Sequence, residues 1–129
     1  MQHIEGPFEV RRTAEPVHAR GEGLLGRHAL DKIYHGDLQG AGVGEMLSAG
    51  TATPGSAGYV AIEKVTGSLK GRKGSFYLQH SGTLTRGQGS LSIHVIPDSG
   101  TEDLHGLRGT MQIVIAEGGK HSYVFDYDL

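Results

Sequence analysis

The stretch that decides the fold is YVAIEKVTGSLKGRKGSFYLQHSGTL, residues 59–84. It contains two runs of alternating apolar and polar residues, 59–69 and 75–84, and such alternation is typical of half-buried β-strands. The segment KGRKG (70–74) lies between them and places three basic residues among glycines. This composition favours a solvated hairpin tip over a phosphate-binding loop. The stretch therefore predicts two antiparallel strands joined by a short turn.

A symmetric pairing of these two strands brings a histidine into the row of core residues. It gives three opposing pairs on one face: Val65 with Phe76, Glu63 with Leu78, and Ala61 with His80. Diagonal neighbours on one face of a sheet lie roughly 5–8 Å apart, so the side chains of Glu63 and His80 are expected to meet inside the fold. The histidine is then a structural group, a metal ligand or a working group in a pocket.

Glu63 and His80 are the candidate catalytic pair. An apolar cavity raises the pKa of a carboxylate, and an adjacent imidazole can hold or relay its proton. The pair is therefore a candidate acid and base acting on a bound neutral substrate. The alternative is an ion pair or hydrogen bond that only fixes the register of the hairpin, and a register slip of one residue would turn the whole row outward. Structural, ligand-contacting and catalytic roles all stay open from the residues alone.

Six further strands are expected outside this hairpin. Their ranges are 3–12, 25–38, 42–51, 90–96, 110–118 and 121–129, with a loop over 13–24. The chain has 22 glycines among 129 residues, well above the average usage of about 7%, and no stretch has a long amphipathic helical period. Glycine is costly inside helices and common at turns and bulges, so the predicted fold class is all-β.

The connections between the strands are mostly short, which predicts a meander or a barrel. Thr101 is followed by two acidic residues, as at the start of a helix, so one short helical turn is expected near 101–107. The length of the chain fits a single domain over residues 1–129. The sequence therefore predicts an eight-stranded antiparallel β-barrel, closed around side chains or one small ligand.

The composition argues against several classes of function. The absence of cysteine rules out disulfides, thiolate nucleophiles and zinc–cysteine sites. A formal net charge of −2, with scattered lysines and arginines, argues against binding to nucleic acid or to an anionic membrane. No apolar run reaches the roughly 18 residues of a membrane helix, and the segment MQHIEGPFEV (1–10) does not resemble a secretory signal. We expect a cytoplasmic protein.

Further side chains are expected to line the pocket. The predicted ligand-contacting residues are Tyr34, Glu45, Tyr59, Val65, Phe76 and Leu78. Glu45 is included because it shares a face with Val43 and Leu47. Its expected partner is Lys32, since an unpaired buried carboxylate is costly. Phenol groups in an apolar barrel suit a small organic ligand.

The eight histidines show no spacing that is typical of a metal site. No expected strand carries His-x-His, and no helix is expected that would support His-x-x-x-His. We predict neither a metal ion nor an organic cofactor.

Four motifs stand out once the strands are assigned. They are YHGDLQG (34–40), the stretch 58–84, VIPDSGTEDLHGLRG (95–109) and YVFDYDL (123–129). Together they resemble a bacterial family described as a domain of unknown function, whose fold is the allene-oxide-cyclase-like barrel. The resemblance extends from about Phe8 to Tyr127 and implies an eight-stranded antiparallel barrel.

The better-known members of the wider superfamily are plant allene oxide cyclases and dirigent proteins. The resemblance implies a barrel that binds apolar or phenolic intermediates and steers their cyclisation or coupling, without a metal or organic cofactor, in an oligomer. The catalytic residues of the plant enzymes are not matched residue by residue here, so none is carried over. Fold alone does not define function.

Two functions are consistent with these observations. The first is a small-molecule-binding barrel that isomerises or cyclises a small apolar or phenolic compound without a cofactor. The alternative is a non-enzymatic oligomeric protein whose barrel is filled by its own side chains. A third class, the metal-dependent enzyme, would require three convergent histidine or carboxylate groups.

Outward-facing apolar residues predict a homo-oligomer. Val60, Ile62, Ile93 and Val114 are expected to face outward, which is more apolar surface than a lone barrel needs. We therefore expect a dimer or trimer with barrel walls in contact.

Overall fold

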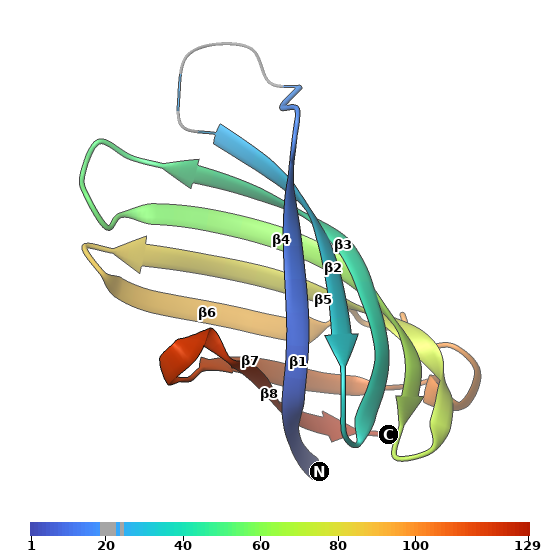
Figure 1. Cartoon of the computed structure of the whole chain (residues 1–129). Coiled ribbons are helices and arrows are strands. Elements are labelled where there is room, and N and C mark those ends of the chain that lie inside the picture. Colours follow the sequence, from blue (N-terminus) through green and yellow to red (C-terminus); the bar gives the residue numbers. More distant parts are fainter. Residues whose placement is uncertain (19–22, 24) are drawn as a thin grey trace.

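The computed structural model describes residues 1–18, 23 and 25–129, which form a closed barrel of eight antiparallel strands (Figure 1). Each strand pairs with the next one along the chain, and β1 pairs with β8 to close the barrel. The strands are β1 (Gln2–Glu15), β2 (Leu25–Tyr34), β3 (Leu38–Gly50), β4 (Ala57–Leu69), β5 (Arg72–Thr85), β6 (Gln88–Val95), β7 (Arg108–Ile115) and β8 (His121–Asp128). The predicted all-β barrel is confirmed. No helix in this described part is long and apolar enough to cross a bilayer.

The central hairpin, β4–β5, has the register that the sequence predicts. All three expected pairs are present: Val65 with Phe76, Glu63 with Leu78, and Ala61 with His80. Lys70 and Gly71 form the tip, and both have positive φ angles, 48° and 83°. Two residues with positive φ give a turn whose twist matches that of the flanking strands. The expected tip over 70–74 is therefore shorter than predicted, because residues 72–74 already pair with β4 as the start of β5.

The connection between β6 and β7 contains the expected helical turn. It is a single 3-10 turn, η1 (Glu102–Leu104). The Thr101 side chain does not cap this turn; its Oγ1 instead accepts a hydrogen bond from the backbone N–H of Ser75 at 3.0 Å. The Ser75 N–H is free to donate to Thr101 because β6 pairs with β5 only from Leu78 onward. The connection thus covers the start of β5, which would otherwise be an open edge.

The first strand is longer than the sequence predicts. β1 continues to Glu15, into the expected loop over 13–24, because its last residues pair with β2. Residues 19–22 and 24 of that expected loop lie outside the described residues. The hairpin between β7 and β8 turns at a second 3-10 turn, η2 (Glu117–Gly119).

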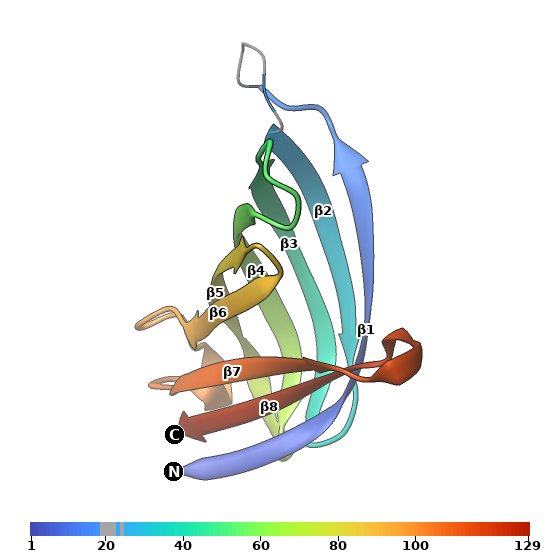
Figure 2. The same cartoon turned by 90° about the vertical axis from the view of Figure 1, so that its left-hand side faces the viewer.

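The barrel interior is filled at one end and hollow at the other. Both chain termini lie at the filled end, where β1 and β8 run side by side (Figure 2), and the β3–β4 and β5–β6 loops lie at the opposite end (Figure 1). A cluster of buried side chains occupies the filled end, including Ile4, Phe8, Tyr34, Leu38, Val65, Leu69, Phe76, Leu78, Leu104, Leu107, Tyr123, Phe125 and Tyr127. A smaller cluster of Leu30, Met46 and Ala61 forms part of the wall of the hollow end. The core is therefore displaced toward the termini and leaves room for a site.

One of the four expected outward residues points inward. Ile93 is 2% exposed, so its predicted outward position is wrong: the end of β6 turns Ile93 and Val95 into the core. Val60, Ile62 and Val114 do face outward, with 53%, 51% and 48% of their surface exposed. The outer surface of the barrel thus keeps much of the apolar character that the sequence predicts.

Candidate functional site

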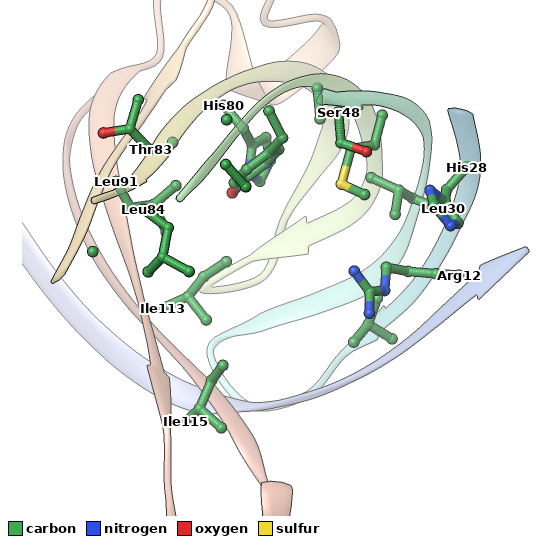
Figure 3. Close-up of a pocket in the computed structure, with 18 of the residues that line it drawn as sticks. Arg12, His28, Leu30, Ser48, His80, Thr83, Leu84, Leu91, Ile113 and Ile115 are labelled. Atoms are coloured by element: carbon green, nitrogen blue, oxygen red, sulfur yellow. The ribbon is translucent and has the colours of Figure 1, made fainter. Parts of the chain in front are cut away.

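A cavity of about 920 Å³ occupies the hollow end of the barrel (Figure 3). This volume lies near the top of the range for small-molecule sites, roughly 300–1,000 Å³. Leu30, Met46 and Ala61 form the buried part of its wall. Leu84, Leu91 and Ile115 also line it and are more exposed, toward the mouth. Most of the lining surface is therefore apolar.

A buried network of four polar side chains lies between this cavity and the filled end. Its centre is Glu63, which is 1% exposed. Three hydrogen bonds reach its carboxylate: Lys32 Nζ donates to Oε1 at 2.8 Å, His80 Nε2 contacts Oε1 at 2.7 Å, and the Tyr34 hydroxyl donates to Oε2 at 2.7 Å. Both carboxylate oxygens are thus satisfied by neighbours on β2 and β5.

Glycines in β3 provide the space for this network. β3 lies between β4, which carries Glu63, and β2, which carries Lys32 and Tyr34. A Cβ atom placed on Gly42 would lie only 2.3 Å from Glu63 Oε2 and 3.1 Å from Cε2 of Tyr34. The missing side chain therefore lets Glu63 reach across β3 to its partners on β2.

The network keeps the Glu63 carboxylate ionised. Burial by itself raises the pKa of this carboxyl, but the hydrogen bond from His80 and the charge of Lys32 together lower it from 4.5 to about 2. The expected raised pKa is therefore wrong, because a cation and donors accompany the carboxylate into the barrel. Burial and the nearby Glu63 charge raise the pKa of Tyr34 well above its ordinary value, so the phenol stays protonated and donates.

His80 is the member of the pair that faces the cavity. His80 belongs to the cavity lining, whereas Glu63 does not. Because an ionised carboxylate only accepts hydrogen bonds, the His80 proton in this contact is on Nε2. The Nδ1 atom of neutral His80 then carries a lone pair, and it has no hydrogen-bond partner among the described residues. Glu63 thus positions an imidazole whose free nitrogen is an acceptor.

The metal-ligand alternative for His80 finds no support in the described part of the chain. No three histidine, cysteine, aspartate or glutamate side chains are grouped there in a way that would hold a metal ion.

The other predicted ligand-contacting residues lie at different depths along the barrel axis, some at the cavity and some in the filled end. Tyr59 lines the cavity, and burial, followed by the Glu63 charge, raises its pKa. Val65, Phe76 and Leu78 are each at most 1% exposed and pack in the filled end, and Tyr34 belongs to the buried network. None of these four is part of the lining, so the structure places them behind the cavity wall and not on it. Alternation along a strand predicts which face a residue occupies but not its depth along the barrel axis.

Glu45 points away from the site. Its side chain is 61% exposed and forms an ion pair with Arg27 on the outer surface. Even-numbered residues of β3 face the interior, so Val43 and Leu47 also face outward. The expected pair with Lys32 is therefore wrong, since Lys32 belongs to the buried network.

Several lining residues were not predicted from the sequence. They are chiefly Arg12, His28, Ser48, Leu84, Leu91 and Ile115. For Arg12 a pattern was available, because it follows Phe8 and Val10 at alternate positions of β1 and so shares their inward face.

The comparisons with known proteins agree on one family. The chain matches the family model described as "Protein of unknown function (DUF3224)" over residues 4–127. It is similar to the crystal structure of a DUF3224 protein with unknown function from Shewanella oneidensis MR-1, with 51% sequence identity and a TM-score of 0.95. That match covers 100% of this chain and 97% of the other, while no curated protein matches. Because the family model extends from the first strand to the last, the chain belongs to the DUF3224 family.

Proposed function

We propose that the protein binds a small, largely apolar organic molecule in the hollow end of its barrel. The observation that carries this proposal is the mostly apolar cavity of about 920 Å³. Leu84, Leu91 and Ile115 at its mouth are 40%, 43% and 64% exposed, so an apolar ligand would remove their side chains from water. A barrel filled by its own side chains, which the structural alternative requires, does not agree with a cavity of this size.

A fluorescent dye provides the test of binding. N-phenyl-1-naphthylamine is neutral and fluoresces in apolar surroundings, and we expect it to bind the protein saturably. Leu91→Glu should weaken this binding about tenfold or more, because the ligand would have to cover a carboxylate. Ser92→Glu is the matched control, since residue 92 follows Leu91 on β6 and is not part of the lining. Absence of saturable binding would contradict the proposal, as would equal effects of the two variants.

We further infer that His80 transfers a proton to or from the bound molecule. The Nδ1 lone pair can accept a proton from a ligand C–H or O–H group, and the Glu63 carboxylate at 2.7 Å from Nε2 stabilises the resulting imidazolium. Return of the proton to another atom of the same molecule completes an isomerisation or a cyclisation without a cofactor. Apolar and phenolic compounds are the substrate class that the aliphatic lining favours.

Deuterium exchange tests this step on a molecule recovered from the cavity of the purified protein. After its identification by native mass spectrometry, incubation with the protein in D2O should place deuterium on a carbon of that molecule. His80→Gln should stop this exchange, whereas His94→Gln, on the same sheet but outside the lining, should not. Exchange that is equally fast without protein would show that His80 transfers no proton.

We also propose that the outer face of β3 and β4 contacts a second copy of the chain. The residues of this β3–β4 outer patch are Val43, Leu47, Val60 and Ile62, each between 47% and 61% exposed. They are adjacent across the two strands, since Leu47 lies opposite Val60 and Val43 lies opposite Lys64. The patch also carries Glu45 and Lys64, so two copies related by a two-fold axis can place opposite charges against each other.

A further inference from the structure

The ionisable side chains that line the cavity are mainly basic. The chain has 14 aspartate and glutamate residues and a net charge of −2, yet no carboxylate belongs to the described lining. The ionisable basic residues that do line it are Arg12, His28, Lys32, His80 and His121. The described lining thus combines apolar surface with basic groups and carries no acid.

Most of these basic groups already have partners. The Lys32 ammonium is 2.8 Å from the Glu63 carboxylate, and the same carboxylate holds His80. The ring of His121 packs edge-on against Phe8, with 5.3 Å between ring centroids. Lys32, His80 and His121 therefore already interact with other side chains of the protein.

Arg12 is different, because none of the described residues offers it an ion pair or a hydrogen bond. Two arginines on the outer surface of the same region do have acidic partners: Arg11 contacts Asp31 at 3.9 Å, and Arg27 contacts Glu45. Figure 3 shows the Arg12 side chain directed into the cavity. The guanidinium is thus a permanent cation that faces the site without a counter-ion.

Two further polar groups stand on the same wall. His28 lies diagonally across from Arg12, which pairs with Leu30, and its Nδ1 is buried without a hydrogen-bond partner in the described structure. A Cβ atom on Gly26 would lie 3.1 Å from Ser48 Oγ and 3.8 Å from His28 Cε1, so these two side chains border one gap. Arg12, His28 and Ser48, from β1, β2 and β3, are called the polar wall below.

The opposite side of the cavity is aliphatic. Its large side chains are Leu84, Leu91, Ile113 and Ile115 from β5, β6 and β7, with Thr83 and Ser90 beside them (Figure 3). The cavity therefore has one side suited to an oxyanion and another suited to a hydrocarbon or aromatic body.

We propose that the ligand of this cavity is an amphipathic carboxylate whose charged group binds Arg12. The guanidinium offers paired N–H donors that match a carboxylate, and Ser48 and His28 supply neighbouring hydrogen-bonding groups. The apolar body of the ligand packs against the aliphatic side. This inference rests on the proposed function, that a small molecule binds here, and names the class of that molecule.

Competition between two matched compounds tests the inference. N-phenyl-1-naphthylamine is bound first, and is then displaced by 2-naphthoate or by naphthalene-2-methanol, which share a ring system and differ in charge. We expect 2-naphthoate to bind about tenfold more tightly, the effect of one charge-assisted interaction. Arg12→Gln should abolish this preference and Arg12→Lys should keep part of it. Arg11→Gln, at the adjacent outward position, should leave it unchanged.

The outcomes separate this inference from the proposed function. If the dye binds and the two competitors displace it equally, the anion site does not exist, although the cavity still binds small molecules. A preference for 2-naphthoate that survives Arg12→Gln would also overturn the assignment to Arg12. Failure of the dye and of both competitors to bind would overturn the proposed function itself.

Discussion

Glu63 accepts hydrogen bonds from Lys32, Tyr34 and His80, and only 1% of its own surface is exposed. Removal of an ionised carboxylate from water costs several kcal/mol, which is offset only while every partner stays in place. The network is therefore better understood as a fixed support for His80 than as a source of net stability. Removal of Glu63 or Lys32 leaves the other charge buried without its counter-ion.

Glu63→Gln should destabilise the protein by about 3–5 kcal/mol at neutral pH, because the Lys32 ammonium loses its buried counter-ion. Urea unfolding followed by circular dichroism measures this change. Glu15→Gln is the control, since Glu15 is exposed at the end of β1, and it should change the free energy of unfolding by less than about 0.5 kcal/mol. A loss for Glu63→Gln as small as that of the control would contradict the network.

The same carboxylate should make the protein sensitive to acid. Its pKa is about 2 in the folded protein and 4.5 ordinarily, so its stabilising contribution is complete above about pH 5 and disappears as the pH falls toward 2. The shift corresponds to about 3 kcal/mol. Urea titrations at successive pH values should therefore show a fall in stability over this window for the wild type and a smaller fall for Glu63→Gln. Parallel curves for the two proteins would show that Glu63 does not titrate in this way.

Of the three contacts that Glu63 makes, the sequence predicts the one with His80 and misses those with Lys32 and Tyr34. The Glu63–His80 contact follows from the register of a single hairpin, which a two-residue turn determines. The contacts with Lys32 and Tyr34 depend instead on a strand two positions away and on the space above Gly42, which no local pattern reveals. The missing partners also explain the wrong pKa direction, since burial alone would raise it.

β3 is the element that gives the site its shape. Glycines occupy its inward positions 40, 42 and 44, and a Cβ atom at Gly40 or Gly44 would lie 2.2 Å from a carbonyl oxygen of β4. The backbones of β3 and β4 therefore approach more closely than side chains would allow, which curves the sheet. Curvature at this position closes the barrel around the network while the other end stays open.

Gly42→Ala should displace the Glu63 carboxylate, because the new methyl group would lie 2.3 Å from Oε2. We expect a loss of about 1–3 kcal/mol of stability and a weaker response of stability to acid. Gly58→Ala is a suitable control, since its Cβ atom would contact only Gly82 O at 3.7 Å. Thermal and urea unfolding of both variants measure the difference. Equal stability of the two alanine variants would show that Gly42 is not needed for the network.

β3 is also where sequence reasoning assigns the wrong face. Three glycines, at 40, 42 and 44, interrupt its inward row between Leu38 and Met46, while Val43 and Leu47 give the outward row an apolar character of its own. Glu45, which shares their face, was placed inside for the same reason. In β4 and β5 the inward row carries large apolar side chains, and there the predicted face is confirmed.

Local sequence patterns predict the overall fold more completely than they predict the site. Eight strands of alternating sequence with short turns predict a closed antiparallel barrel, and the barrel and the family are both confirmed. The likeness to allene-oxide-cyclase-like barrels stays a prediction. The division of the interior into a filled end and a cavity was not predictable, because it depends on how side-chain volumes from all eight strands add up along the barrel axis.

The β3–β4 outer patch predicts self-association of the whole barrel. Sedimentation equilibrium at micromolar concentration should show a dimer or trimer, because burial of the four aliphatic side chains is favourable. Val60→Glu should shift the protein toward the monomer, whereas Thr13→Glu, at an exposed position of β1, should not. A wild-type protein that sediments as a monomer would contradict the interface.

The most direct test of the account is the state of His80 in solution. Long-range nitrogen–proton spectra of the imidazole side chains, assigned with His80→Gln, distinguish the two neutral tautomers. We predict a proton on Nε2, a free Nδ1, and a change in the Nδ1 resonance when N-phenyl-1-naphthylamine saturates the cavity. A proton on Nδ1, or His80 resonances that do not move when the dye is bound, would contradict the claim that Glu63 holds this imidazole toward a ligand site.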